Sequence, residues 1–208
     1  MKRLLLSAAL AAGSLTAARA QESRFGVKAG GSLTTYVGQD VNESSRSKAG
    51  FHGGLVASLG LTERLSLQPE LLYSMKGIQD ESNAPGLNIK GSQTLYYADV
   101  PVLAKLRFNR LFLEAGPQIG VLVAAKGTVE SGTTRLVQAN KRSFNDLDVG
   151  YALGAGFQAA GGLMAGLRYN GGLRNVIKPV TGSGGITAQP EGRNSALQLY
   201  VGFLFAGK

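Results

Sequence analysis

The side chains that could carry out a reaction in this chain are few, and they begin with its single histidine, His52. A histidine beside a serine hydroxyl can serve as the general base of a hydrolase, and Ser74 or Ser92 could lie across from it. None of the serines stands in the Gly-X-Ser-X-Gly sequence of a nucleophile elbow. We therefore interpret His52 as a structural residue and expect that the protein is not an enzyme.

Two carboxylates, Glu70 and Glu114, offer a second chemistry, because a pair of carboxyl groups can act as general acid and base. Basic residues at matching positions of other segments could instead neutralise the pair, which makes ion pairing the simpler interpretation. The chain has no cysteine and one histidine, so a thiolate or multi-histidine metal site is excluded. We expect neither a metal nor another cofactor.

The elements that position these residues are strands with one apolar and one polar face. From Leu95 to Lys126, the even positions up to Asn109 and the odd positions after Arg110 are uncharged, whereas the positions between them carry the charges. Alternation with a period of two is typical of β-strands. Because only Asn109 and Arg110 separate the two halves, the stretch is predicted to form a tight hairpin.

The same alternation recurs along the chain in eight segments, whose connections are alternately long and short. An even number of strands with tight turns at one end and long loops at the other is the plan of outer-membrane barrels. The fold class is therefore predicted to be all-β, an eight-stranded antiparallel up-and-down transmembrane β-barrel. The expected strands are 24–35, 50–61, 65–76, 94–108, 111–126, 148–159, 163–173 and 194–205, and the long loops are 37–49, 77–93, 127–147 and 174–193.

One face of every segment lacks charge. The eight faces together hold 52 residues without a single Asp, Glu, Lys or Arg, although 17% of the chain is charged. A charged side chain in the middle of a bilayer costs about 2 to 4 kcal/mol, so these faces are expected to contact lipid. Tyr73, Tyr96, Tyr151 and Tyr169 near the loop ends, with phenylalanines near the turn ends, are predicted to form two aromatic girdles, and Phe51 departs from this pattern.

The opposite face carries ten charged residues, six basic and four acidic. The interior of an eight-stranded barrel is just wide enough for side chains to fill it, so we predict a structural network of ion pairs in the lumen. Its two glutamates are expected to meet Lys28, Lys105 and Arg168. Lys126 is assigned to the same face. The predicted network comprises Lys28, Glu70, Lys105, Arg107, Glu114 and Arg168.

Prolines within the expected strands affect strand pairing, and glycines affect the space inside the barrel. Pro69, Pro101 and Pro117 each remove a donor from the hydrogen-bond ladder, and we interpret them as β-bulges. Glycines on the polar face are expected to make room for the large charged side chains; they are Gly26, Gly30, Gly154, Gly156 and Gly166.

The first 20 residues have the composition of a secretory signal peptide. Lys2 and Arg3 precede an apolar run that is too short to span a bilayer, and Ala18-Arg19-Ala20 fits the cleavage pattern. We expect a signal peptide at 1–20 and an outer-membrane β-barrel domain at 21–208, located in the cell outer membrane. Three of the nine formal charges belong to the signal peptide, so the mature chain would carry +6, and export excludes nucleic acid as a partner.

Several of these strands are similar to a known family. The stretches 65–77, 98–108, 111–122 and 197–205, with Pro-Glu-Leu-Leu-Tyr, Val-Pro-Val-Leu and Ala-Gly-Pro as their most specific pieces, resemble the PorT-like, or porin-family, outer-membrane β-barrel proteins. The resemblance implies an eight-stranded barrel in a gram-negative outer membrane. The founding member is linked to protein secretion and gliding machinery, a role that a shared fold does not transfer. This chain departs from such barrels where Ala206-Gly207-Lys208 follow the aromatic Phe205.

The leading functional interpretation is a structural or binding platform that works through the long extracellular loops. Basic loop residues could meet lipopolysaccharide phosphates at the outer leaflet, although solvated charges without a partner are the simpler interpretation. An unidentified protein partner at the loops stays open, and a monomer is expected. The basic loop residues are Arg135, Lys141, Arg142, Arg174 and Lys178.

Two alternatives follow from the same pattern. A narrow porin-like channel is one, and the charged filling of so small a barrel argues against it. The other is a soluble, lipocalin-like barrel that turns its apolar face inward around a ligand, because alternation does not say which face is inside. A soluble exterior would carry about 25 to 35% charge, whereas the polar face of this chain is largely Gly, Ala, Ser and Gln.

Overall fold

The computed structural model describes residues 23–39, 45–84, 87–131, 134–139, 141–181, 187–188 and 191–206. The expected signal peptide, 1–20, lies outside the described residues. All regular elements within the described ranges are β-strands. No helix in this part of the chain has the length and apolar character that a membrane span requires.

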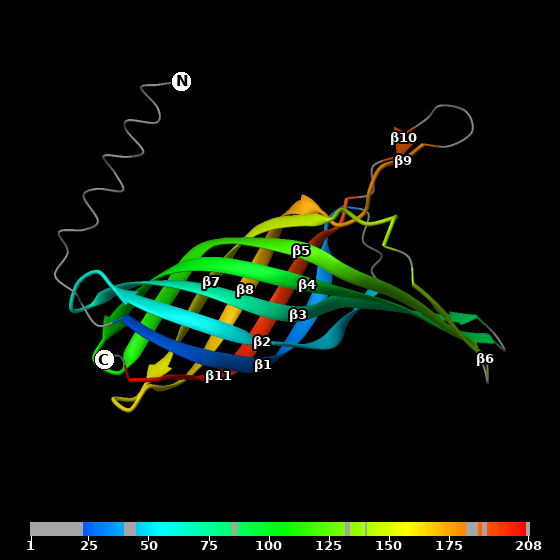
Figure 1. Cartoon of the computed structure of the whole chain (residues 1–208). Helices are drawn as coiled ribbons and strands as arrows, with labels where there is room; N and C mark the ends of the chain where they lie inside the picture. Colours follow the sequence, from blue (N-terminus) through cyan, green and yellow to red (C-terminus); the bar gives the residue numbers. More distant parts are fainter. Residues whose placement is uncertain are drawn as a thin grey trace, which may run out of the picture.

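Eight strands close into a barrel (Figure 1). Neighbours along the chain pair antiparallel, the first strand pairs with the last from Gly26–Leu204 to Val37–Arg193, and the β4–β5 pairing completes the ring. The predicted fold class is confirmed. The barrel strands are β1 (Ser23–Val37), β2 (Ser45–Gly60), β3 (Leu65–Ala84), β4 (Leu87–Phe108), β5 (Leu111–Ser131), β7 (Leu147–Gln158), β8 (Leu163–Asn175) and β11 (Arg193–Leu204).

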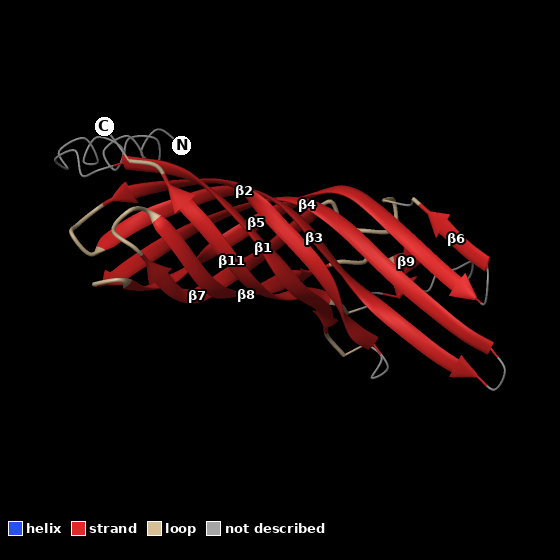
Figure 2. Cartoon of the chain, turned by 90° about the horizontal axis from the view of Figure 1, so that it is seen from below, coloured by secondary structure: helices blue, strands red, loops and turns tan. Residues whose placement is uncertain are grey.

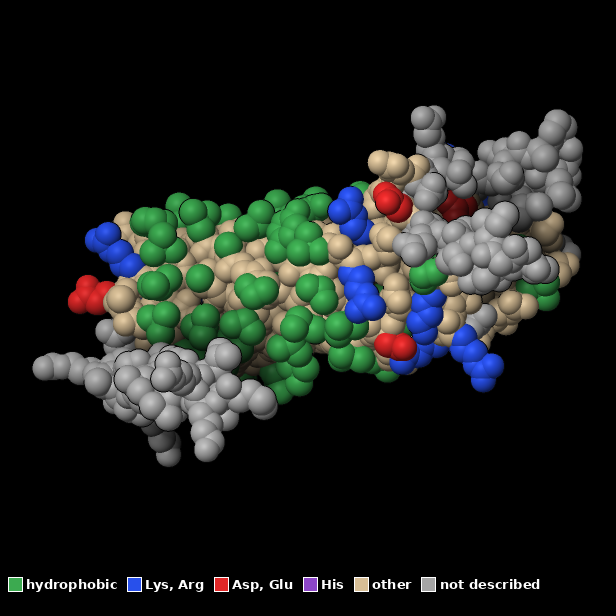
Figure 3. All heavy atoms as spheres, turned by 90° about the horizontal axis from the view of Figure 1, so that it is seen from above, with side chains coloured by type: hydrophobic (Ala, Val, Ile, Leu, Met, Phe, Trp, Pro, Cys, Tyr) green, Lys and Arg blue, Asp and Glu red, His purple; other side chains and the backbone are tan. Residues whose placement is uncertain are grey.

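The strands face lipid and lumen as the alternation predicts. Phe25 on the uncharged face of β1 is 66% exposed, whereas Lys28 on the other face is 2% exposed. All eight barrel strands carry exposed apolar side chains. On the face seen in Figure 3 they form a broad belt, and charged side chains lie beyond its two edges. This arrangement is the reverse of the soluble, lipocalin-like alternative, which needs the apolar face inside.

Aromatic residues mark the edges of the belt. At the long-loop edge, the rings of Tyr73 and Tyr96 stack at 5.8 Å, and Tyr151 lies 6.2 Å from Tyr169. Phe51, which departs from the sequence pattern, belongs to this girdle, because its ring centroid lies 6.2 Å from that of Tyr73. Side chains of this kind prefer the headgroup region of a bilayer.

Three neighbouring strands continue far beyond the barrel. β3, β4 and β5 have 20, 22 and 21 residues, whereas β7 and β11 have 12. The short strand β6 (Thr134–Gln138) pairs with β5, so that a four-stranded sheet projects from the long-loop end (Figure 2). The β3–β4 pairing keeps one register from Leu65–Leu106 to Ala84–Leu87. Two further short strands, β9 (Val180–Thr181) and β10 (Thr187–Ala188), pair with each other.

The expected loops 77–93 and 127–147 are therefore partly strand. Our prediction of loops rested on the end of the apolar alternation, and that alternation ends where the strands leave the bilayer. Outside the bilayer neither face of a sheet needs to be apolar, so pairing can continue through polar residues.

The tight turns at the opposite end have local causes. Asn109 has a φ of 56°, in the left-handed region that Asn tolerates better than most residues, and it closes the two-residue turn between β4 and β5. In the turn between β2 and β3, the Thr62 hydroxyl oxygen accepts hydrogen bonds from the backbone N–H groups of Arg64, at 3.3 Å, and Leu65, at 3.0 Å.

The interpretation of the three prolines as bulges is wrong. Pro69 pairs with Val102, Pro101 with Gln118, and Pro117 with Tyr151, and the register is unchanged across each of them. Each proline strand also pairs with the strand that precedes it in the sequence. That second pairing is interrupted for two residue pairs at the proline and then resumes in the same register. Each residue of an antiparallel ladder directs its N–H to one side only, so a missing donor weakens one contact and leaves the other intact.

A real bulge lies elsewhere and reverses one predicted face. The β4–β5 register shifts between Tyr96 and Tyr97, which pair with Ala124 and Leu122, so Val123 is the extra residue. Beyond it the inward and outward positions of β5 exchange. Lys126 is consequently exposed, with its ammonium 5.6 Å from the centre of the Tyr96 ring, and it does not belong to the lumen face.

Candidate functional site

A network of ion pairs occupies the middle of the lumen. The Arg168 guanidinium donates to both carboxylate oxygens of Glu70, at 2.7 and 2.9 Å, and through Nε to Glu114 at 2.7 Å. The Lys28 ammonium donates to Glu70 at 2.9 Å. All four side chains are fully buried. Strands β1, β3, β5 and β8 each contribute one of them, so the network connects opposite walls of the barrel.

Uncharged polar residues complete this network, and our sequence analysis did not identify them. Gln68 donates to Glu70 at 2.6 Å, and the Tyr200 hydroxyl donates to Glu114 at 2.9 Å. The Tyr200 ring also lies 3.7 Å from the Lys28 ammonium, within the range of a cation–π contact. A signal was present in the sequence, because both residues lie at inward positions of their strands.

Two predicted members lie outside the ion pairs. Lys105 is buried and close to the network, but its ammonium donates to Gln68 at 3.2 Å and lies over the Phe112 ring at 3.8 Å. The assignment of Arg107 to the network is wrong, since that side chain is exposed at the turn end and donates to the Glu63 carbonyl oxygen at 3.2 Å. Alternation gives the direction of a side chain and not its depth along the barrel.

A second ion-pair cluster lies nearer the long-loop end. The Lys76 ammonium donates to Asp99 at 3.1 Å and to Asp148 at 3.2 Å. Asn194 donates to Asp148 at 2.9 Å and to the Tyr97 hydroxyl at 3.4 Å. One lysine thus lies between two carboxylates from different strands, β4 and β7.

Apolar side chains pack the lumen next to the charged layers at both ends. Toward the short turns, they are Val56, Phe112, Met164, Tyr200 and Leu204. Toward the loops, they are Tyr36, Ile78, Leu95, Tyr97, Leu122, Ala125 and Val176, with Phe144 against them. Buried side chains therefore fill the barrel interior at successive levels between the two ends.

Two inward glycines show how the large side chains fit. A Cβ at Gly166 would lie 2.6 Å from the Tyr200 hydroxyl, and one at Gly154 would lie 2.8 Å from the Glu114 carboxylate. Contacts below 3 Å are too short for a methyl group, so these positions need glycine to leave the hydrogen bond between Tyr200 and Glu114 in place.

The single histidine is part of this filling. His52 is 2% exposed, and its Nδ1 lies 3.0 Å from the Ser32 hydroxyl. Ser74 is its neighbour in the β2–β3 pairing, and Ser92 accepts a hydrogen bond from the Lys48 ammonium. Within the described ranges, no group of three or more His, Asp or Glu side chains is placed to hold a metal ion.

Three of the predicted basic loop residues lie beside carboxylates. Arg135 pairs with Glu130 at 3.2 Å, while Lys141 and Lys178 both approach Asp146, at 3.1 and 3.5 Å. Their charges are thus partly neutralised within their own loops. The hydrogen bond from Lys141 and the charge of Lys178 lower the pKa of the exposed Asp146 carboxyl below its ordinary value. Arg174 is exposed near the end of strand β8, and Arg142 follows Lys141 in the sequence.

Comparison with known proteins decides the family. Residues 19–178 match the family model described as the outer membrane protein beta-barrel domain. The chain belongs to this family. The match covers more than half of the sequence and agrees with the closed barrel and its apolar belt, so the protein is a small β-barrel of the outer membrane. No curated protein sequence matches the chain.

Solved structures of similar outline include three bacterial surface barrels. Ail of Yersinia pestis shares 14% identity over 90% of this chain and 100% of its own, with a TM-score of 0.47. Neisserial surface protein A shares 15% over 86% and 96%, with a TM-score of 0.44. The N-terminal barrel domain of Pseudomonas aeruginosa OprF shares 13% over 89% and 100%, with a TM-score of 0.37. At these identities the likeness concerns the fold alone.

Proposed function

We propose that this outer-membrane barrel is a binding platform with a closed lumen, and that the sheet formed by the ends of β3, β4 and β5 with β6 is its working surface. The observation that carries the proposal is the continuation of three neighbouring strands beyond the belt. Such a sheet is continuous with the barrel wall, because the same β3–β4 and β4–β5 pairings run through both.

The filled lumen supports a platform in preference to a channel. A conducting pore needs a continuous polar path, and here fully buried ion pairs lie between two clusters of apolar side chains. We propose that the network around Arg168 is structural, since it connects opposite walls and uses all of its charges internally.

The edge strand β6 supports a protein partner at the platform. Residues 134–138 pair with β5 on one side, and in the sheet order no described strand follows on the other side. Leu136 and Val137 are 63% and 57% exposed. An open edge with exposed apolar side chains can accept an extended segment of another protein as an additional strand. Lipopolysaccharide is the weaker candidate, because the basic residues Arg135, Lys141 and Lys178 already have acidic neighbours.

Three further assignments belong to the proposal. We infer a non-enzymatic protein because His52 is buried within the lumen and bonded to Ser32. The motifs at 65–77, 98–108 and 111–122 support a PorT-like member of the family. The composition of residues 1–20 supports a removable signal peptide, which leaves 21–208 as the mature barrel.

Photo-crosslinking in intact outer membranes tests the platform. A photoreactive amino acid at position 136 or 137 is expected to give a discrete protein adduct. The matched control is position 199, where Leu199 is 67% exposed on the lipid-facing side of β11 and is expected to give lipid adducts alone. The folding of each variant is verified by the heat-dependent shift in its electrophoretic mobility. If a folded barrel gives no protein adduct at position 136 or 137, the platform is refuted.

A further inference from the structure

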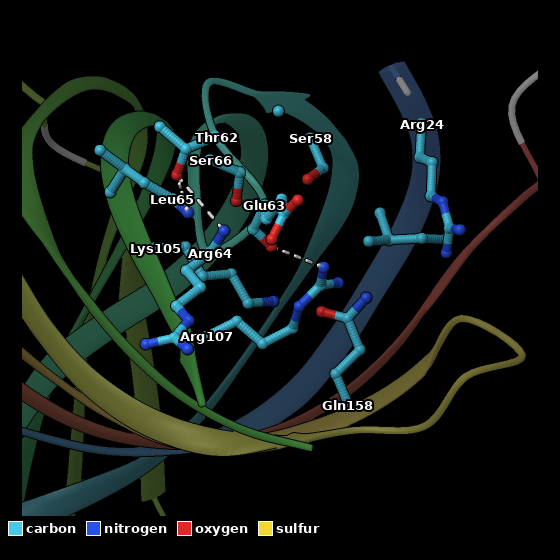
Figure 4. A pocket seen from close by; sticks show the side chains of 12 residues that line it. Arg24, Ser58, Thr62, Glu63, Arg64, Leu65, Ser66, Lys105, Arg107 and Gln158 are labelled. Carbon is cyan, nitrogen blue, oxygen red and sulfur yellow. Dashed lines mark hydrogen bonds between the residues drawn. The ribbon is translucent and has the colours of Figure 1, made fainter. Parts of the chain in front are cut away.

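The short-turn mouth of the barrel holds a cavity of 210 Å³ (Figure 4). The start of β1, the end of β2, the following turn and the ends of β4 and β7 contribute to its lining. Four lining residues are cationic, and Glu63 is the acidic one, so the formal charge around the cavity is +3. The cationic residues are Arg24, Arg64, Lys105 and Arg107.

The turn between β2 and β3 fixes Arg107 at this mouth. The Arg107 backbone N–H donates to the Arg64 carbonyl oxygen at 2.8 Å, and its guanidinium donates to the Glu63 carbonyl oxygen at 3.2 Å. That partner is neutral, so the contact leaves the positive charge of Arg107 uncompensated. A guanidinium has five N–H donors, and most of them remain for another group.

Lys105 lies on the inner side of the cavity and differs from the other buried lumen cations. Lys28, Lys76 and Arg168 each contact a carboxylate. Lys105 is 2% exposed, yet among the described residues no carboxylate lies within ion-pairing distance of its ammonium. Leaving a buried charge unpaired is costly, and an anion entering from the mouth would neutralise it.

We propose that this mouth binds a phosphate group. Phosphate suits the site because its terminal oxygens can accept donors from several directions, and arginine guanidinium groups match them in bidentate geometry. A phosphate monoester carries about −1.5 to −2 charges at neutral pH, which fits a lining of +3. Ser58, Ser66 and Gln158 add hydroxyl and amide donors to the same cavity. Because short turns of such barrels face the periplasm, the phosphate comes from a soluble periplasmic compound or from an inner-leaflet lipid headgroup.

Inorganic phosphate is the first probe. The full barrel in maltoside micelles free of phospholipid is titrated with phosphate at constant ionic strength, and backbone amide signals are followed by NMR. Saturable shifts are expected for residues 62–66 and 105–107. The double variant R64Q/R107Q is expected to bind at least tenfold more weakly, and R174Q, which removes an exposed arginine at the opposite end, is expected to bind like the parent.

A second arm identifies the source of the phosphate. The same signals are compared in nanodiscs of phosphatidylcholine, whose phosphate is a choline diester, with and without the phosphate monoester of phosphatidic acid, in a buffer free of inorganic phosphate. Shifts that require phosphatidic acid and are absent with inorganic phosphate support the site and assign it to a lipid headgroup. The proposal is overturned if neither probe gives saturable shifts, or if R64Q/R107Q responds like the parent. If the double variant does not fold, R64Q alone, which changes an exposed side chain, serves instead and is expected to weaken binding severalfold.

Discussion

Arg168 is the residue on which the lumen network depends. It contacts both Glu70 and Glu114, and without it Glu70 would keep its ion pair with Lys28, whereas Glu114 would lose the ion pair that it makes in the lumen. A buried pair adds little stability over an apolar replacement, but removing one partner leaves a buried charge uncompensated. The network is therefore better regarded as a constraint on which side chains can occupy the lumen than as a large source of stability.

Replacing Arg168 by methionine should destabilise the barrel strongly. R168M is expected to lower the free energy of unfolding by about 3 to 5 kcal/mol, because Glu70 and Glu114 lose their shared partner. Denaturant unfolding in detergent or lipid vesicles measures it. The exposed Arg174 provides the matched control R174M, for which no change is expected. An R168M barrel as stable as R174M would show that the ion pairs are not needed.

Glycine at position 166 is predicted to be required for the placement of Tyr200. The Cβ of G166A would lie 2.6 Å from the Tyr200 hydroxyl, so the hydrogen bond to Glu114 should be lost, at a cost of about 1 to 3 kcal/mol. G161A is the control, because a Cβ there meets nothing within 4 Å. Equal unfolding free energies for the two variants would contradict the tight fit.

At the scale of the strands, much could be predicted from the sequence. The period of two placed Lys28, Glu70, Glu114 and Arg168 on inward positions, because side-chain direction in a strand follows directly from residue parity. Parity fails after a bulge, and nothing in the residues around Val123 identifies one, which is why Lys126 was assigned to the wrong face.

Other features depend on pairing partners that a single sequence does not reveal. The prolines keep their register because the missing N–H groups fall on one side of each strand, and the sequence does not indicate which side that is. The parts of β3, β4 and β5 that extend beyond the bilayer lack the apolar–polar alternation from which strands were predicted. The depth of Arg107 depends on where the turn at Glu63 folds back over the barrel end.

The contacts of Asp146 with Lys141 and Lys178 should weaken in acid. Because Lys141 and Lys178 lower the pKa of Asp146, the ionised carboxylate stabilises their contact at pH values above the ordinary Asp pKa of about 3.9, and this contribution is lost as the pH falls through the lowered value. An NMR titration of the Asp146 carboxyl should give a midpoint below about 3.9. In K141M/K178M the midpoint should return toward that value. A parent midpoint at or above it would contradict the loop contacts.

The whole molecule combines a lipid-facing apolar belt, a lumen filled by side chains and an extracellular sheet. The belt accounts for its place in the outer membrane, because charge on a lipid-facing position is costly. Many of the charged side chains of the barrel strands are instead buried in the lumen. We therefore propose that function resides at the two ends of the barrel, at the sheet edge formed by β6 and at the basic mouth beside Arg107.

Single-channel recording in planar bilayers tests the filled lumen most directly. We predict that the purified barrel inserts without producing stable openings, because Arg168, Glu70 and Glu114 connect the walls and apolar side chains pack on either side of them. Insertion is verified independently by protease protection of the reconstituted protein. Stable openings of porin size from the folded parent barrel would contradict the account.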